Sequence, residues 1–170
     1  MNKEETERLK ELARQQKAAN KKFLSRLKRQ KKSLKLDEIF HELHHEAFQK
    51  IDCLECANCC KSISPIVWDK DIQRIASYLK MKPSEFTATY LKIDEEGDFV
   101  FRQTPCPFLL PDNYCSIYGI RPRSCREYPH TDRKNIHQIL DLTLKNTFIC
   151  PAVYEIIESL KKRLPLSIKK

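Results

Sequence analysis

Residues 53–60 read Cys53-Leu-Glu-Cys56-Ala-Asn-Cys59-Cys60, so four cysteines fall within eight positions. Two residues between cysteines place both sulfur atoms on one side of a tight turn, at a separation that a single metal ion can bridge. Tetrahedral zinc takes four such thiolates, and a second C-x-x-C step is the spacing with which bacterial ferredoxins surround a cubane iron–sulfur cluster. The pattern therefore indicates a zinc or iron–sulfur site.

Four further cysteines are available to complete such a site, namely Cys106, Cys115, Cys125 and Cys150. Two of them precede a proline, as the closing ligand of a ferredoxin cluster does. The neighbours Cys59 and Cys60 should point in different directions, because adjacent side chains diverge on a helix and alternate on a strand. We expect one of them to serve a first centre and the other to serve a second centre or to pack in the core.

Disulfides and isolated buried thiols are the alternatives to metal ligands. The N-terminal sequence lacks the apolar segment of a signal peptide, and no stretch approaches the roughly 20 apolar residues that cross a bilayer. We therefore expect a cytoplasmic protein, in which thiols stay reduced and a cysteine array points to metal before disulfides. Buried free cysteine is common singly, but it does not account for four cysteines in eight residues.

The charge pattern separates a basic N-terminal segment from a neutral remainder. Of 170 residues, 41% are hydrophobic and 32% are charged, which suits one modest domain with an appendage. Residues 1–35 hold thirteen Lys and Arg against four Glu, a net charge of +9, whereas residues 36–170 hold nineteen of each sign. The two glycines, Gly97 and Gly119, are too far apart to form a glycine-rich phosphate loop.

Hydrophobic periodicity predicts a mainly helical chain. A charged helix is expected over residues 2–33, and its thin apolar stripe would let it extend into solvent, pair weakly or fray. Other helices are expected over 36–50 with Asp37 as a candidate cap, over 69–80 capped by Asp69, over 83–90, and from Pro151 onward. Residues 91–102 should form a β-hairpin turning at Glu96-Gly97, 103–130 a loop, and 133–147 a helix or extended segment.

These elements predict an α+β fold that is mainly α. We expect a small cysteine-rich metal-binding domain with one β-hairpin and an N-terminal extended helix. The predicted parts are a basic helical extension over residues 1–35, the cysteine-cluster metal-binding domain over 36–163 and a tail over 164–170.

The cysteines stand within a longer set of motifs: Pro105-Cys106-Pro107-Phe108-Leu109, Tyr114-Cys115-Ser116-Ile117-Tyr118, Arg121-Pro122-x-x-Cys125-Arg126-Glu127-Tyr128-Pro129 and Cys150-Pro151. With residues 53–60, this set resembles the CxxCxxCC zinc- or iron-chelating domain family, also called YkgJ-like cysteine cluster proteins. The resemblance covers about residues 53–152. It implies metal chelation by all eight cysteines, that is by Cys53, Cys56, Cys59, Cys60, Cys106, Cys115, Cys125 and Cys150.

The same resemblance names possible activities. Relatives in this family include iron–sulfur oxidoreductases and longer flagellin lysine N-methylases. The chain lacks the additional region of the methylases, and the resemblance does not reach its basic N-terminal helix.

Charged side chains near the cysteines have two readings each. Arg121, Arg123 and Arg126 flank Cys125 and either hold an anionic substrate or compensate thiolate charge, and compensation is the favoured reading. Two histidines, His41 and His45, lie one helical turn apart like a metal-binding pair. The polar face of a helix is the favoured interpretation, because eight thiols already supply enough ligands.

The basic N-terminal helix is a candidate nucleic-acid surface, with a solvated helix as the favoured alternative. Its single aromatic residue, Phe23, gives little support for base stacking. The cations that would meet phosphates are Lys21, Lys22, Arg26, Lys28, Arg29, Lys31 and Lys32.

Three functions follow from the sequence. The first is an iron–sulfur protein, as an oxidoreductase or as an accessory of a protein-modifying enzyme. The second is a structural zinc module whose basic helix binds a partner or nucleic acid. The third, suggested only by the family resemblance, is an enzyme like a protein lysine N-methylase.

Overall fold

The computed structural model describes residues 1–29 and 35–164. These residues group into two compact units. Unit 1 takes Met1–Cys53 together with the chain from Pro129 onward, and unit 2 takes Leu54–Tyr128. Residues 30–33 of the predicted N-terminal helix and residues 165–170 of the predicted tail lie outside the described residues. The domain boundaries expected from the sequence stay a prediction.

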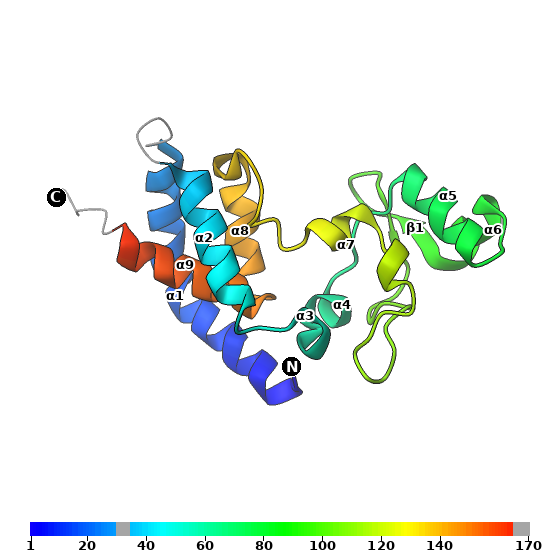
Figure 1. Cartoon of the computed structure of the whole chain (residues 1–170), viewed down its shortest axis with the longest axis horizontal. Coiled ribbons are helices and arrows are strands. Elements are labelled where there is room, and N and C mark those ends of the chain that lie inside the picture. The colour runs from blue at the N-terminus through cyan, green and yellow to red at the C-terminus, as the bar shows by residue number, and fades with distance from the viewer. Residues whose placement is uncertain (30–34, 165–170) are drawn as a thin grey trace. The chain divides into compact units, whose positions relative to one another are not determined.

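Unit 1 is a bundle of helices contributed by both of its segments (Figure 1). The first segment forms α1 (Lys3–Arg29) and α2 (Leu36–Phe48). The second forms the 3-10 helix η2 (Ile136–Ile139), α8 (Leu140–Asn146) and α9 (Pro151–Arg163). Its apolar core is drawn from every one of the four α-helices and includes Leu27, Phe40, Leu140, Ile156 and Leu160.

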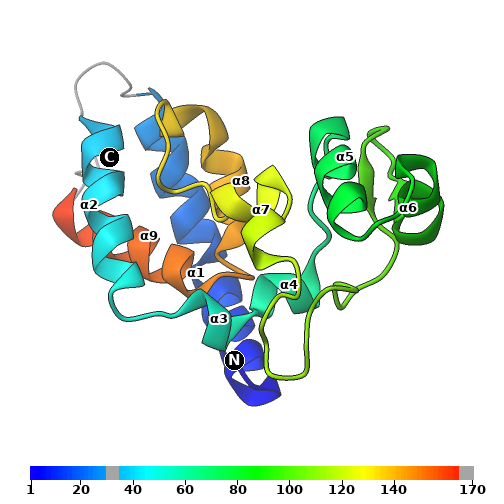
Figure 2. The same cartoon turned by 45° about the vertical axis from the view of Figure 1, so that its right-hand side comes forward.

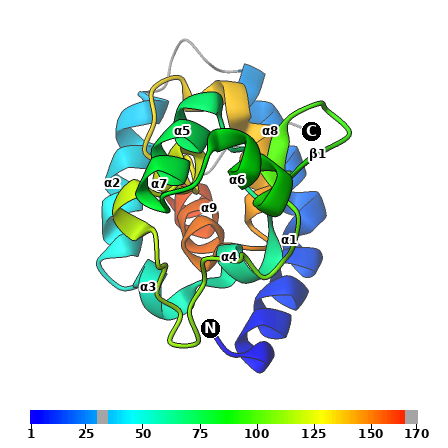
Figure 3. The same cartoon turned by 90° about the vertical axis from the view of Figure 1, so that its right-hand side faces the viewer.

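The long basic helix α1 packs along the bundle (Figure 3). Its thin apolar stripe, which includes Leu9, Ala13 and Leu24, is buried, and it contacts α8 and α9. The helix begins with a reciprocal cap that was not predicted. Asn2 Oδ1 accepts the backbone N–H of Glu5 at 2.8 Å, and Glu5 Oε2 accepts that of Asn2 at 2.8 Å. The apolar stripe of α1 is therefore packed against other helices of unit 1, an outcome that the sequence pattern did not predict.

The loop before η2 is attached to α2 by three polar side chains. Asp37, predicted to cap its own helix, instead accepts the backbone N–H groups of Asn135 and Ile136 at 2.7 and 3.0 Å, whereas the N-cap of α2 is Lys35. One turn on, His41 Nε2 lies 3.2 Å from Asp132 Oδ1. The third link is a hydrogen bond of 2.8 Å between His44 Nδ1 and Thr131 Oγ1. Asp37 therefore orders a segment about a hundred residues away in sequence, which periodicity cannot reveal.

Unit 2 has a second, aromatic-rich core. The unit contains α5 (Asp69–Tyr78), α6 (Pro83–Tyr90) and an antiparallel hairpin of β1 (Leu91–Ile93) and β2 (Phe99–Phe101) (Figure 2). Gly97, at a φ of 88°, makes the hairpin turn, as predicted. The core residues are Val67, Ile72, Ile75, Ala76, Phe86, Leu91, Phe101, Phe108 and Ile117.

Short helices replace the loops expected around the cysteines. Single-turn helices α3 (Cys53–Cys56) and α4 (Asn58–Ser62) carry the first cluster. The predicted loop over 103–130 contains η1 (Tyr118–Ile120) and α7 (Arg123–Glu127). Asp69 was also wrong as a cap, because Trp68 is the N-cap of α5 and its N–H is bonded to Asp71. The fold class was right: among the described residues the chain is α+β, mainly α, with one hairpin.

Candidate metal centre

The cysteines are distributed over both units. Cys53, at the start of α3, and the buried Cys150, just before α9, belong to unit 1. The other six belong to unit 2, where Cys56 ends α3, Cys59 and Cys60 lie on α4, Cys106 and Cys115 lie in the segment after the hairpin, and Cys125 lies on α7. All eight lie among the described residues, and no disulfide joins any of them.

Cys106 and Cys115 share a local design. In each case the backbone N–H two residues later, that of Phe108 or Ile117, donates a hydrogen bond to the cysteine sulfur. The same two residues place their side chains in the core of unit 2, where Phe108 packs against Phe86 and Phe101. Core burial thereby fixes the backbone donor that faces each sulfur. Amide groups directed at sulfur favour the thiolate, which is the form that binds metal.

Backbone hydrogen bonds bring α4 and the 106–115 segment together. The N–H of Cys106 donates to the carbonyl of Cys60 at 2.8 Å. An isolated β-bridge pairs Leu109 with Cys115, and the N–H of Leu110 donates to the carbonyl of Tyr114 at 2.7 Å. This closed loop returns Cys115 to the neighbourhood of Cys106, although nine positions separate them in sequence.

A buried aspartate on α5 holds α7, the helix that carries Cys125. Asp71 is 2% exposed, and its Oδ2 accepts the N–H of Arg123, in the first turn of α7, at 3.2 Å. Its Oδ1 accepts a hydrogen bond from Arg74 Nη2, which also donates to the carbonyl of Arg121 at 3.0 Å. The position of Cys125 therefore depends on a short polar network rooted in α5.

Four sulfurs of unit 2 form one electrostatic group, composed of Cys60, Cys106, Cys115 and Cys125. Burial raises the pKa of Cys125 to about 12 and that of Cys106 to about 11, and negative charge on the other sulfurs of the group adds to each shift. The pKa of Cys115 is raised for the same reasons. Several thiolates can coexist here only if a cation offsets their repulsion, and a bound metal ion supplies one.

Cys60 differs from its three partners. A hydrogen bond from the thiol of Cys59 is the largest cause that lowers the pKa of Cys60, to about 7. The two sulfurs are 4.0 Å apart, so the adjacent pair does not diverge as its position on a helix predicted. Two thiolates on one tetrahedral zinc are separated by about 3.8 Å, as follows from Zn–S bonds of about 2.3 Å. The 4.0 Å separation is therefore compatible with ligands of one centre.

Arg121 is the cation shared by the sulfur group. Its positive charge lowers the pKa of Cys60, Cys115 and Cys125 against the stronger effect of burial at the last two. The guanidinium is held over the ring of Tyr118, 3.7 Å from the centroid, and Nη1 donates to the carbonyl of Tyr118 at 2.7 Å. Charge compensation, the favoured reading of the arginines, fits Arg121. Arg123 is committed to an ion pair with Glu127.

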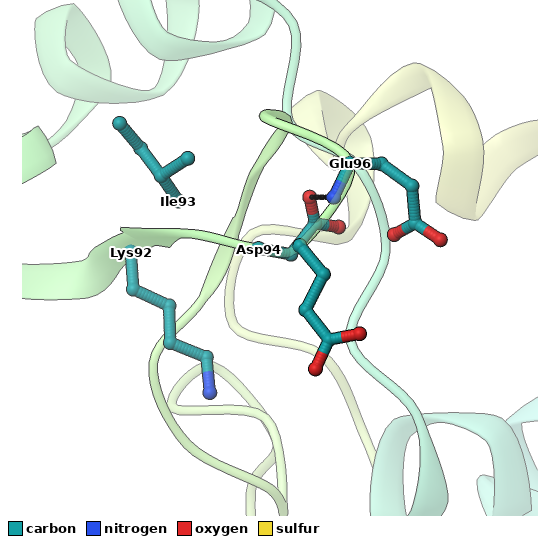
Figure 4. A pocket seen from close by; sticks show the side chains of 5 residues that line it. Lys92, Ile93, Asp94 and Glu96 are labelled. Carbon is teal, nitrogen blue, oxygen red and sulfur yellow. Dashed lines mark hydrogen bonds between the residues drawn. The ribbon is translucent and has the colours of Figure 1, made fainter.

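The remaining candidates have structural partners. His41 is engaged by Asp132. A surface hollow at the hairpin turn is lined by Lys92–Glu96 and contains none of the cysteines, and Asp94 within it accepts the N–H of Glu96 at 3.1 Å to close the turn (Figure 4).

Within residues 1–29 and 35–164, no three Cys, His, Asp or Glu side chains stand close enough to hold a metal ion without moving. Metal binding therefore requires the thiols to close round the ion.

The four cysteines of the sulfur group lie in a segment that matches a known sequence family. A family model described as "Putative zinc- or iron-chelating domain", named CxxCxxCC, matches residues 52–148. The chain belongs to this family. Membership of the CxxCxxCC family confirms the resemblance noted from the motifs, and the metals in its description are those expected from the cysteine spacing.

The chain is also similar to an uncharacterized protein, MJ0661, of Methanocaldococcus jannaschii. The two are 33% identical over 82 residues, which are 46% of this chain and 44% of the relative. The chain thus matches less than half the length of that protein. No solved structure matches the chain. None of the described helices is both long enough and apolar enough to cross a membrane.

Sequence reasoning missed two parts of this site. The repeated arrangement of a cysteine followed two positions later by a core residue, in Cys106-Pro-Phe108 and Cys115-Ser-Ile117, was visible in the sequence as a spacing. The role of Asp71 carried no such signal, because an aspartate in a first helical turn is ordinary and its bond to Arg123 spans 52 positions.

Proposed function

We propose that Cys60, Cys106, Cys115 and Cys125 hold one zinc or iron centre in unit 2, and that this centre stabilises the unit. The observation that supports it is the mutual electrostatic influence of these four sulfurs, which come from three separate segments. Zinc and iron–sulfur clusters both accept four thiolates. A metal bound here links α4, the 106–115 segment and α7, none of which has a large core of its own.

The residues present suit such a centre. Backbone N–H groups reach the sulfurs of Cys106 and Cys115, and Arg121 supplies positive charge without competing as a ligand. These features tune a thiolate site, because hydrogen bonds and nearby cations stabilise ligand charge. The raised pKa values of Cys106 and Cys125 mean that binding releases protons, so affinity falls steeply as the pH is lowered.

The other four cysteines, Cys53, Cys56, Cys59 and Cys150, remain predicted ligands. Cys59 approaches the proposed centre, because its sulfur lies 4.0 Å from that of Cys60. The finer activity of an iron–sulfur oxidoreductase is supported by the C-x-x-C-x-x-C run and by the Cys-Pro pairs. A redox cluster supplies one-electron transfer, and a zinc ion supplies a cross-link alone.

The test begins with protein purified without oxygen. Metal content, acid-labile sulfide and the visible spectrum separate the two metals: a brown sample with iron and sulfide means a cluster, and a colourless one with stoichiometric zinc means a structural ion. Cys125→Ser should lose at least one metal equivalent, whereas the adjacent Ser124→Ala should keep the wild-type content. If Cys125→Ser keeps full metal content, Cys125 is not a ligand and the proposed set is wrong.

A further inference from the structure

The basic helix α1 presents one side to α8 and carries a row of lysines along that side. Lys21 follows Lys17 by four positions and Lys28 follows Lys21 by seven, which places the three on one side of a helix with 3.6 residues per turn. Contacts in unit 1 fix which side this is. Lys17 Nζ lies 6.0 Å from the centroid of the Phe148 ring, just past α8, and Lys28 Nζ lies 2.8 Å from Asp141 Oδ2 on α8.

A single carboxylate sits among four cations at this edge. The pKa of Asp141 is lowered by its hydrogen bond with Lys28, and the charges of Lys28, Lys21 and Lys145 all act on it. We call Lys17, Lys21, Lys28 and Lys145, with Asp141 among them, the basic face; all five side chains belong to exposed residues. The four lysines of the face and Asp141 give it a net charge of +3. From Leu12 to Arg29, α1 contains seven Lys and Arg and no acidic residue.

We propose that the basic face binds the phosphate backbone of duplex nucleic acid without reading its sequence. The row from Lys17 to Lys28 is about 16 Å long at 1.5 Å per residue, a length over which each strand of B-DNA carries about five phosphates. The row stands on a helix that is fixed in place, because the adjoining side of α1, which includes Leu24 and Leu27, is buried in unit 1. Preformed cations lose little conformational freedom on binding a regular polyanion.

Features of the same face favour a duplex over other polyanions. Proteins bind single strands by stacking bases on aromatic side chains. Phe23 of α1 is buried and the neighbouring Phe148 ring is covered by Lys17, so neither ring is available for stacking. An anionic membrane would engage an apolar helical stripe as well as cations, and the apolar stripe of α1 is already packed in the core. Backbone contacts by lysine remain, and these carry affinity without sequence information.

The test measures the salt dependence of binding to a 20-base-pair duplex of mixed sequence by fluorescence anisotropy. The variant Lys17→Gln/Lys21→Gln/Lys145→Gln should weaken binding and reduce the slope of log affinity against log salt by about 2.7, at 0.9 per lost contact. The matched control is Arg8→Gln/Lys22→Gln/Arg29→Gln, which removes the same charge from exposed residues on other sides of α1. It should keep most of the slope.

A gain-of-function variant keeps the proposal testable if the triple variants fail to fold. Asp141→Asn removes the one acidic group of the basic face and should tighten duplex binding several-fold at low salt. The proposal is overturned by equal losses in both triple variants, since net charge alone would then explain binding. It is equally overturned by no effect of Asp141→Asn, or by binding to phosphatidylserine vesicles with none to the duplex.

Discussion

Removing the carboxylate of Asp71 should loosen the metal centre from a distance. In the wild-type protein this buried side chain accepts hydrogen bonds from the N–H groups of Trp68 and Arg123 and pairs with Arg74. The variant Asp71→Ala leaves the first turn of α7 without its acceptor. Because α7 carries Cys125, the loss should reach the sulfur group although Asp71 is no ligand.

The size of the effect follows from the groups left without a partner. A buried backbone donor that loses its acceptor costs about 1–3 kcal/mol, and Asp71→Ala leaves two part-buried donors without their acceptor. The ion pair adds less, because the Arg74 side chain is 31% exposed and retains the carbonyls of Ile120 and Arg121. We expect unit 2 to lose about 3 kcal/mol of unfolding free energy, and metal affinity to fall by up to about a hundredfold at 1.4 kcal/mol per decade.

The chain provides both a probe and a control for this experiment. Trp68 is the single tryptophan and belongs to unit 2, so its fluorescence in a urea titration reports on the unfolding of that unit. Metal affinity comes from competition with a chromophoric chelator. The control Asp69→Ala removes an exposed carboxylate from the same first turn and should cost under about 0.5 kcal/mol. Equal costs for the two variants would refute the role assigned to Asp71.

Other expected outcomes concern both units. Asn20 is fully buried on α1 and neither side-chain polar atom bonds to a described residue, so Asn20→Leu should raise stability by about 1–3 kcal/mol, seen as a higher melting temperature. In metal-free protein the folded state keeps protons on Cys106 and Cys125 above pH 9, where an unperturbed thiol loses them. The free energy of unfolding should therefore decrease as the pH rises above about 9. A urea midpoint that stays constant over this pH range would contradict the prediction. Under the same conditions iodoacetamide should modify Cys60 before Cys125, because Cys60 has the lowest pKa of the group. Peptide mapping measures the order of modification. Arg121→Gln should raise the pKa of Cys60 and slow its reaction with iodoacetamide. If the pH dependence of that reaction is unchanged in the variant, Arg121 has no electrostatic effect on Cys60.

The helices and the hairpin could be predicted because they depend on local patterns. Pro83 starts α6, Gly97 turns the hairpin, and Cys150-Pro151 opens α9, each through a backbone preference that a short window contains. The caps at Asp37 and Asp69 were wrong for different reasons. The carboxylate of Asp37 binds a distant segment, which only tertiary structure decides, whereas Asp69 is already the first residue of α5, whose N-cap is Trp68.

The chemistry of the site was predictable and its geometry was not. Cysteine spacing and family motifs together indicated zinc or iron, since C-x-x-C steps constrain neighbouring sulfurs directly. Which sulfurs act on one another depends on the bridge between Leu109 and Cys115 and on the bond from Asp71 to Arg123. Both are set by tertiary packing, and the close approach of Cys59 and Cys60 departs from ideal helical directions.

Unit 1 is discontinuous, because residues 54–128 interrupt it. During synthesis, α1 and α2 emerge long before α8 and α9, so the exposed apolar side of the first pair has no bundle to join. By the time α8 and α9 emerge, residues 54–128 have already been synthesised, so unit 2 has all of its strands and sulfurs. We expect unit 2 to fold and to bind its ion while the bundle of unit 1 is still incomplete, so that metal loading precedes completion of that bundle.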